Sequence, residues 1–177
     1  MKNTKMWVTV NGCILLLALL GARYVSKAQS QKKSSGDEAA IRALEGKFAA
    51  AVNSGDIDAI MKNYIPDKSL VVFDVVPRKQ SSGADAYRKD WQDFFSHFKG
   101  KPRIEITNLG ITVEGNLGFG HSIQHVTGIN KEGHPVNRTV RVTDGYRKIG
   151  GNWLIVLEHV SVPVDLRTGK ANLTSGV

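Results

Sequence analysis

The sequence predicts an α+β fold in which three N-terminal helices pack on a strongly curved, mainly antiparallel sheet to form a cone. Apolar residues recur at three- and four-residue steps in separate segments between residues 37 and 98, and they alternate with polar residues in strand-like segments after residue 103. The alternation slips by one residue between Asn108 and Gly110, which predicts a bulge, and bulges bend long strands. A bent sheet covered by helices encloses a hollow, so we expect a pocket for a small molecule.

Three helices are predicted in the first part of the chain. The first begins at Asp37 and stops at Asn53-Ser54-Gly55, and the second follows Asp56, a residue that caps helices. The third runs from about Ala84 to Phe98. Its apolar stripe is mostly aromatic and consists of Tyr87, Trp91, Phe94, Phe95 and Phe98.

Strands are predicted in the remaining segments. A short one spans Ser69 to Val76, and the others form an antiparallel meander with glycine-containing turns between them. The strands of the meander are Arg103 to Glu114, Leu117 to Ile129, Val136 to Lys148 and Asn152 to Val162. The last strand is apolar on both faces, so its outer face needs a cover, and we expect a homodimer formed through the sheet.

The two ends of the chain read as separate segments. Lys2 and Lys5 precede an apolar run that ends before Arg23, which is typical of a secretory signal peptide, here residues 1–28. A flexible lead (29–36), the domain (37–164) and a flexible, loosely held tail (165–177) follow. We expect export to the periplasm or the extracellular space, with no stable membrane insertion after cleavage. The alternative is an N-terminal membrane anchor.

The net charge argues against a nucleic-acid-binding protein. The whole chain carries +8, but without residues 1–28 it keeps 20 basic and 16 acidic residues and a charge of +4. No stripe of basic residues interleaved with aromatic ones follows. We therefore expect no nucleic-acid partner, and expect a small apolar organic ligand instead.

Several phrases of the sequence resemble a known family. They are Asn53-Ser54-Gly55-Asp56, the run from Val72 to Pro77, Tyr87-Arg88-Lys89-Asp90-Trp91, Thr143-Asp144-Gly145-Tyr146-Arg147-Lys148, and the run from Trp153 to Pro163. With the order of the helices and strands, they resemble the SnoaL-like domains of the nuclear transport factor 2-like superfamily, which includes ketosteroid isomerase. The resemblance implies the cone fold, which hosts isomerases, cyclases and dehydratases as well as non-catalytic modules.

The resemblance also implies catalytic residues. Asp74 falls near the position of the isomerase's general base, and Asp144 falls where that enzyme keeps a protonated aspartic acid as a donor to the oxyanion. The isomerase's tyrosine donor falls on Phe48, which has no hydroxyl. Burial raises the pKa of a carboxyl group, so two such acids supply an acid and a base. Asp144 has a structural alternative, an ion pair with Arg138 on the same strand face.

His121 is a third candidate catalytic residue, as a proton carrier in the hollow or else as a hydrogen-bonded core histidine. Histidine spacing along the strands does not favour a metal site, and no motif requires a cofactor. We expect Glu158 to face inward beside Val156. The predicted ligand-binding residues are Phe48, Tyr64, Trp91, Phe119, Val142, Val156 and Glu158.

Together these features predict an exported SnoaL-like domain that binds an apolar carbonyl compound. Its reaction would be a cofactor-free isomerisation, cyclisation or dehydration. The alternative is a non-catalytic module of the same fold that binds a ligand or forms oligomers.

Overall fold

The computed structural model of the chain describes residues 36–76 and 80–174. The predicted signal peptide and nearly all of the predicted lead lie outside these residues. None of the helices within the described ranges is long and apolar enough to cross a membrane.

Three helices are present in the described residues, as the sequence predicted. The first covers residues 36–54 and ends at Gly55, whose φ of 70° suits glycine. The second, α2 (Ile57–Met61), is capped by Asp56, whose carboxylate accepts a hydrogen bond from the Ala59 N–H at 2.9 Å. The third, α3 (Ala84–Ser96), begins after Gly83.

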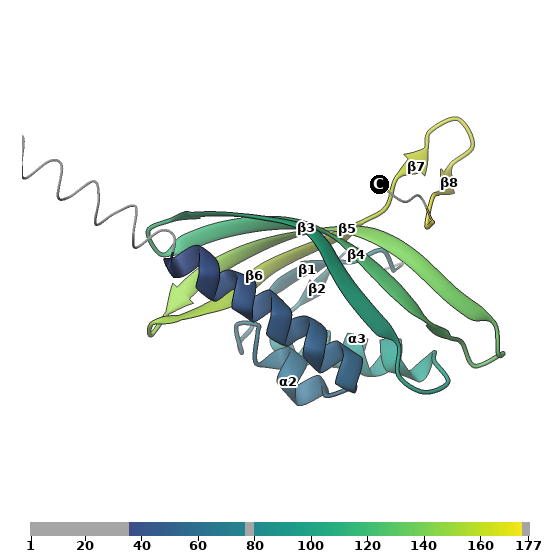
Figure 1. The fold of residues 1–177 in the computed structure, drawn as a ribbon, viewed down its shortest axis with the longest axis horizontal. Coiled ribbons are helices and arrows are strands. Elements are labelled where there is room, and N and C mark those ends of the chain that lie inside the picture. Colours follow the sequence, from purple (N-terminus) through teal and green to yellow (C-terminus); the bar gives the residue numbers. More distant parts are fainter. Residues whose placement is uncertain (1–35, 77–79, 175–177) are drawn as a thin grey trace, which may run out of the picture. The chain divides into compact units, whose positions relative to one another are not determined.

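A six-stranded sheet in the order β2-β1-β6-β5-β4-β3 forms the other layer (Figure 1). Its strands are β1 (Val71–Phe73), β2 (Ser81–Ser82), β3 (Arg103–Glu114), β4 (Leu117–Ile129), β5 (Pro135–Ile149) and β6 (Asn152–Ser161). Strands β3 to β6 form the predicted antiparallel meander. Strand β1 pairs parallel with β6, which the sequence did not predict, and the two-residue β2 was too short to recognise.

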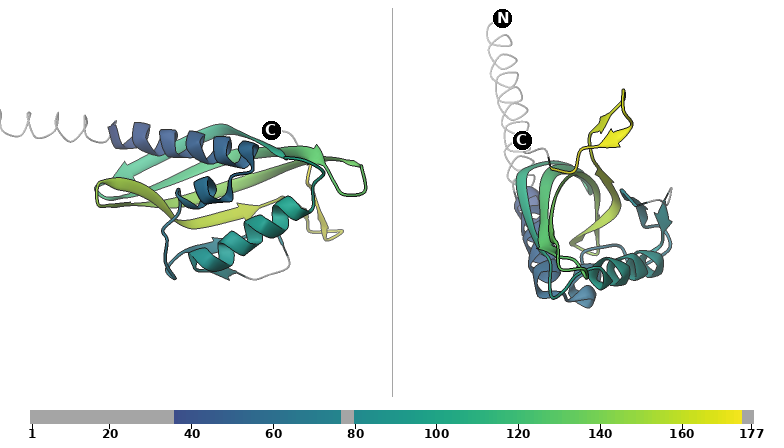
Figure 2. Two further views of the ribbon diagram at one scale, coloured as in Figure 1. Left: turned by 90° about the horizontal axis from the view of Figure 1, so that it is seen from below. Right: turned by 90° about the vertical axis from the view of Figure 1, so that its right-hand side faces the viewer.

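The sheet is bent, and bulges mark where its register changes. One register shift lies between Thr107 and Gly110, which confirms the predicted bulge, and Asn108 there has a φ of 52°. A second shift, not predicted, lies between Gly145 and Tyr146 where β5 pairs with β6. Figure 2 shows the sheet curving around the side that the helices cover. This arrangement confirms the predicted cone of helices on a curved sheet.

The core fills the space between the helices and the concave face of the sheet. Gly120 on β4 makes room for one of its largest side chains: a Cβ there would lie 2.8 Å from the Tyr146 hydroxyl oxygen. Glycine at this position lets the Tyr146 ring lie across β4 and reach the first helix. The largest fully buried hydrophobic side chains include Tyr64, Tyr146, Ile41, Ile60, Leu70 and Ile155.

The C-terminal segment has more regular structure than the sequence analysis expected. Strands β7 (Val164–Asp165) and β8 (Lys170–Ala171) form a small hairpin. The carbonyl oxygen of Leu173 accepts a hydrogen bond from the Thr139 N–H at 2.8 Å. This bond links the described end of the chain to β5.

Candidate functional site

Three carboxyl groups are buried on the side of the sheet that faces the helices. Glu45 lies on the first helix, Asp144 on β5 and Glu158 on β6, with 2%, 3% and 4% of their surfaces exposed. Asp144 and Glu158 are partners in the register of β5 and β6, so their side chains emerge next to each other. No Lys or Arg is among the buried residues of the described chain. The three acids therefore share an interior without a compensating cation.

Two tyrosines hold Glu158. The Tyr64 hydroxyl donates a hydrogen bond to Oε2 of Glu158 at 2.6 Å, and the Tyr87 hydroxyl donates to Oε1. Both hydroxyls keep their protons, because burial raises the pKa of each tyrosine well above its usual value. Glu158 is thus equipped to carry a negative charge, with one donor for each oxygen.

A third tyrosine connects the other two acids. The Tyr146 hydroxyl donates to Oε1 of Glu45 at 2.8 Å, and it lies close enough to Asp144 to lower the pKa of that carboxyl against the effect of burial. The phenol has a single proton to donate. That proton is used in the bond to Glu45. Asp144, Tyr146 and Glu45 form a buried polar cluster that extends from β5 to the first helix.

Burial sets the protonation of these acids. It raises the pKa of Asp144 well above its ordinary value, and the nearby charges of Glu158 and Glu45 add to the effect. Burial also raises the pKa of Glu158 to about 7, although the bonds from Tyr64 and Tyr87 oppose it. The pKa of Glu45 is raised by burial as well, against the bond from Tyr146. The carboxyl group of Glu158 therefore gains or loses its proton near neutral pH.

Some buried polar atoms in the described part of the chain have no hydrogen-bond partner: Oδ1 of Asp144, Nε1 of Trp91 and Oγ of Ser122. Such atoms are uncommon in folded proteins, because an unmade buried hydrogen bond destabilises the fold. Asp144 is therefore not held in the ion pair with Arg138 that the sequence left open. Arg138 is exposed and donates to the carbonyl of Asn137 instead.

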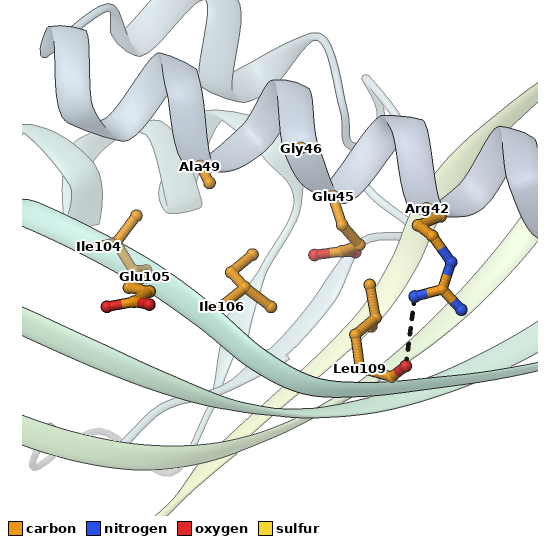
Figure 3. Close-up of a pocket in the computed structure, with 8 residues that line it drawn as sticks. All are labelled: Arg42, Glu45, Gly46, Ala49, Ile104, Glu105, Ile106 and Leu109. Atoms are coloured by element: carbon orange, nitrogen blue, oxygen red, sulfur yellow. Dashed lines mark hydrogen bonds between the residues drawn. The ribbon is translucent and has the colours of Figure 1, made fainter.

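A groove of about 500 Å³ opens between the first helix and β3 (Figure 3). Glu45 is one of its lining residues, although only 2% of its surface is exposed, so the Glu45 side of the buried cluster lies against the wall of the groove. Apolar side chains make up much of the remaining wall. The other lining residues are Arg42, Gly46, Ala49, Ile104, Glu105, Ile106 and Leu109.

Asp74, the predicted base, lies just beyond the end of β1. It is half-buried, and its Oδ1 accepts a hydrogen bond from the N–H of its neighbour Val75 at 2.6 Å. Burial raises the pKa of Asp74, and the charge of Asp90 raises it further. The Asp74 charge in turn raises the pKa values of Glu158 and Tyr87, so the structure places Asp74 near the Glu158 end of the acid cluster.

His121 and Phe119 lie on the other face of the sheet from the acids. Both are exposed, Phe119 at 55%, so neither lines an internal hollow and both placements correct the sequence analysis. The inward positions on β4 are even-numbered and include Gly118 and Gly120, which have no side chain. The odd-numbered residues therefore looked like the apolar face, although the space above the glycines is filled by Ile41 and Tyr146.

The remaining predicted ligand-binding residues belong to the interior, where Phe48, Tyr64, Trp91 and Val142 are buried and Val156 is half-buried. Of these, Tyr64 contacts Glu158 directly, and Phe48 packs its ring edge against Trp91 at 5.7 Å. None of them lines the groove between the first helix and β3.

Glu45 was not among the functional residues predicted from the sequence. A signal was present, since Glu45 lies four residues after Ile41 and three before Phe48, on the apolar face of the helix. An acid on that face needs a partner or a function. Among the described residues, no group of three or more His, Cys, Asp or Glu side chains is arranged to hold a metal ion.

Comparisons with known proteins agree with this architecture. Residues 41–165 match the SnoaL-like domain family, and no curated protein matches the chain. The structure is similar to an NTF2-like protein of unknown function from Pseudomonas putida KT2440, with 29% identity, a TM-score of 0.72, and coverage of 81% of this chain and 99% of that one.

Two further solved structures share the fold. An NTF2-like superfamily protein from Salmonella enterica serovar Typhimurium LT2 is 18% identical with a TM-score of 0.65, covering 75% of this chain and 94% of that one. A ketosteroid isomerase-like protein from Erwinia carotovora atroseptica is 22% identical with a TM-score of 0.59, covering 70% and 93%.

Proposed function

Because this chain belongs to the SnoaL-like domain family, whose fold hosts proton-transfer enzymes, we propose that it binds an apolar carbonyl compound and moves a proton on it without a cofactor. One observation carries the proposal: a cluster of buried polar groups, Asp144, Tyr146 and Glu45, in which Tyr146 hydrogen-bonds Glu45, borders a groove.

Glu45 is the proposed base, in place of Asp74, because it is the buried acid that lines the groove. In its ionised form it takes a proton from the carbon next to the carbonyl group, and the electrons of that C–H bond move to the carbonyl oxygen. After the base exchanges its proton with solvent, delivery of a solvent proton to the same carbon gives hydrogen exchange, and delivery of a proton to another carbon gives isomerisation. Tyr146 holds the Glu45 carboxylate in place by its hydrogen bond, and Asp144 lies beside Tyr146 in the same buried cluster.

Deuterium exchange tests this proposal. Cyclohexanone in D₂O is followed by NMR with and without the protein. We expect the wild-type protein to speed the exchange of the hydrogens next to the carbonyl, and Glu45→Gln to slow it at least about 100-fold, as loss of a general base does. Asp144→Asn acts through Tyr146, so its loss is expected to be smaller, about tenfold.

Two results would contradict this assignment. Exchange that Asp74→Asn abolishes and Glu45→Gln preserves would return the role of base to Asp74. A wild-type rate equal to that of buffer, with cyclohexanone bound, would favour the non-catalytic ligand-binding module. Circular dichroism of each variant checks that the fold is intact.

A second role, assembly into a homodimer, is supported by the outer face of the sheet. Leu117, Phe119 and Leu157 lie on this face with 57%, 55% and 36% of their surfaces exposed. Exposed large apolar side chains grouped on one face are typical of a contact with another protein.

Charges around this outer face fit a second copy of the same chain. The exposed acids Glu105 and Glu114 lie on β3, and the exposed bases Arg141 and Arg147 lie on β5. A two-fold axis that places β3 of one copy over β5 of the other pairs opposite charges twice. Light scattering should show a dimer that Phe119→Asp dissociates and that Leu166→Asp, in the C-terminal hairpin, leaves intact.

We also propose that the chain is exported, on the basis of the signal-peptide pattern in residues 1–28. Cell fractionation, with mass spectrometry of the mature N-terminus, tests this. Recovery of the uncleaved chain in the membrane fraction would favour the anchor instead.

A further inference from the structure

Gly46 lies in the interior of the first helix and lines the groove (Figure 3). A glycine in the interior of a helix makes the helix less stable than an alanine does, because glycine loses more backbone conformational entropy when the chain folds. Packing does not require it here, since a Cβ at Gly46 would meet no atom within 4 Å. Gly120 differs in this respect, because Tyr146 occupies the space above it. The open space over Gly46 allows a ligand to lie directly against the helix backbone.

Arg42, one turn earlier on the helix, brings a positive charge to one end of the groove. Its Nη1 donates to the carbonyl oxygen of Leu109 at 3.4 Å, and its Nη2 donates to Oε1 of Glu38 at 2.9 Å. These bonds hold the guanidinium beside β3 while half of its side chain stays exposed. A guanidinium has five N–H donors, so Arg42 can donate hydrogen bonds to a further carboxylate.

Arg42 makes one end of the groove positive. Glu105 borders the groove next to Ile104, but it alternates with the inward-facing Ile104 and Ile106 and is exposed, so its side chain points to the outer face of the sheet. An anionic group is therefore attracted to the Arg42 end. Ala49, Ile106 and Leu109 provide apolar surface along the rest of the groove.

We propose that the substrates of this groove are apolar carboxylic acids, with the carboxylate on Arg42 and the hydrocarbon chain lying across Gly46. The inference rests on the proposed function, because it names the substrate class of the same groove. A carbonyl group partway along such a chain comes next to Glu45.

Calorimetric titration of the full chain with octanoate, octan-1-ol and octylamine at neutral pH tests the charge preference. These probes share a chain length and differ in the charge of the head group. We expect octanoate to bind about tenfold more tightly than octan-1-ol, and octylamine to bind most weakly. Arg42→Gln should remove the preference for octanoate, and Glu38→Gln should strengthen octanoate binding by freeing the guanidinium.

Lys47→Gln is the matched control, because it removes one positive charge from an exposed position on the same helix outside the groove. We expect it to leave the preference unchanged. Octan-1-ol or octylamine binding as tightly as octanoate would overturn the proposal, and so would an equal loss of octanoate affinity in Lys47→Gln and Arg42→Gln.

Gly46→Ala tests the path of the chain with two measurements. The melting temperature of the free protein should rise, because alanine favours the helix, while octanoate affinity should fall at least about threefold, because the methyl group occupies the ligand's space. A higher melting temperature with unchanged affinity would overturn this placement. Deuterium exchange separates the two proposals: cyclohexanone exchange that persists without octanoate preference contradicts only the substrate class.

Discussion

Tyr64 and Tyr87 stabilise the ionised form of Glu158 inside the protein. Each donates to one oxygen of Glu158, so the carboxylate is buried with both oxygens satisfied. We predict that Tyr64→Phe destabilises the fold by about 1–3 kcal/mol at pH 8, where Glu158 is mostly ionised, because a buried charge loses its donor. Urea unfolding should show a smaller loss at pH 5, where Glu158 carries its own proton. Equal losses at both pH values would contradict this role.

Gly120 tests the packing of Tyr146 over β4. A Cβ at this position would lie 2.8 Å from the Tyr146 hydroxyl oxygen and 3.3 Å from the carbonyl oxygen of Gly110. We predict that Gly120→Ala destabilises the fold by about 1–3 kcal/mol, because the ring or the neighbouring strand must move. Gly46→Ala is the control, expected to stabilise by about 0.5–1 kcal/mol. If both variants gained stability in urea unfolding, the close approach of Tyr146 would be wrong.

At the scale of the elements, the bulge in β3 depends on the left-handed backbone of Asn108, whose φ is 52°. Asparagine tolerates this conformation, and a β-branched residue does not. We predict that Asn108→Val lowers the free energy of unfolding by about 1–2 kcal/mol, whereas Asn108→Gly leaves it nearly unchanged. Chemical denaturation of the two variants measures the difference. A Val variant as stable as the Gly variant would show that the bulge does not need this backbone conformation.

The elements that the sequence predicted well are those with long patterns. The meander and the bulge at Asn108 follow from alternation over ten or more residues, and β3 and β4 begin and end as predicted. Strand β1 proved shorter than predicted, and its parallel pairing with β6 joins segments that are far apart in the chain. No local pattern records such a pairing, so it could not be predicted.

The candidate site was predicted less completely than the fold. Strand parity predicted that Asp144 faces the core, because it shares its strand face with Val142 and Tyr146, and it favoured an inward Glu158; both side chains are buried. Parity misplaced His121, because glycines on the inner side of β4 hid which face was apolar. The groove itself depends on how the first helix packs over β3. This is a tertiary contact, and the sequence pattern of neither segment alone predicts it.

At the scale of the whole molecule, the buried acids make stability depend on pH in an unusual direction. Folding raises the pKa values of Glu45, Asp144 and Glu158, so the folded protein holds protons that the unfolded chain releases. Wherever the folded state binds more protons, the free energy of unfolding falls as the pH rises. Many proteins stabilised by surface ion pairs show the opposite trend above pH 4, because their carboxyl pKa values are lowered by folding.

Glu158 gives this trend a range of pH that can be measured. Its pKa rises from 4.5 to about 7 on folding, so its contribution is fully present below 4.5 and is lost as the pH passes 7. The shift corresponds to about 3 kcal/mol. We predict that wild-type protein is more stable at pH 5 than at pH 8, and that Glu158→Gln removes about 3 kcal/mol of the difference. Urea unfolding at both pH values measures it, with Glu105→Gln, an exposed acid, as the control. A Glu158→Gln protein that keeps the full wild-type difference would mean that the proton is held elsewhere in the cluster.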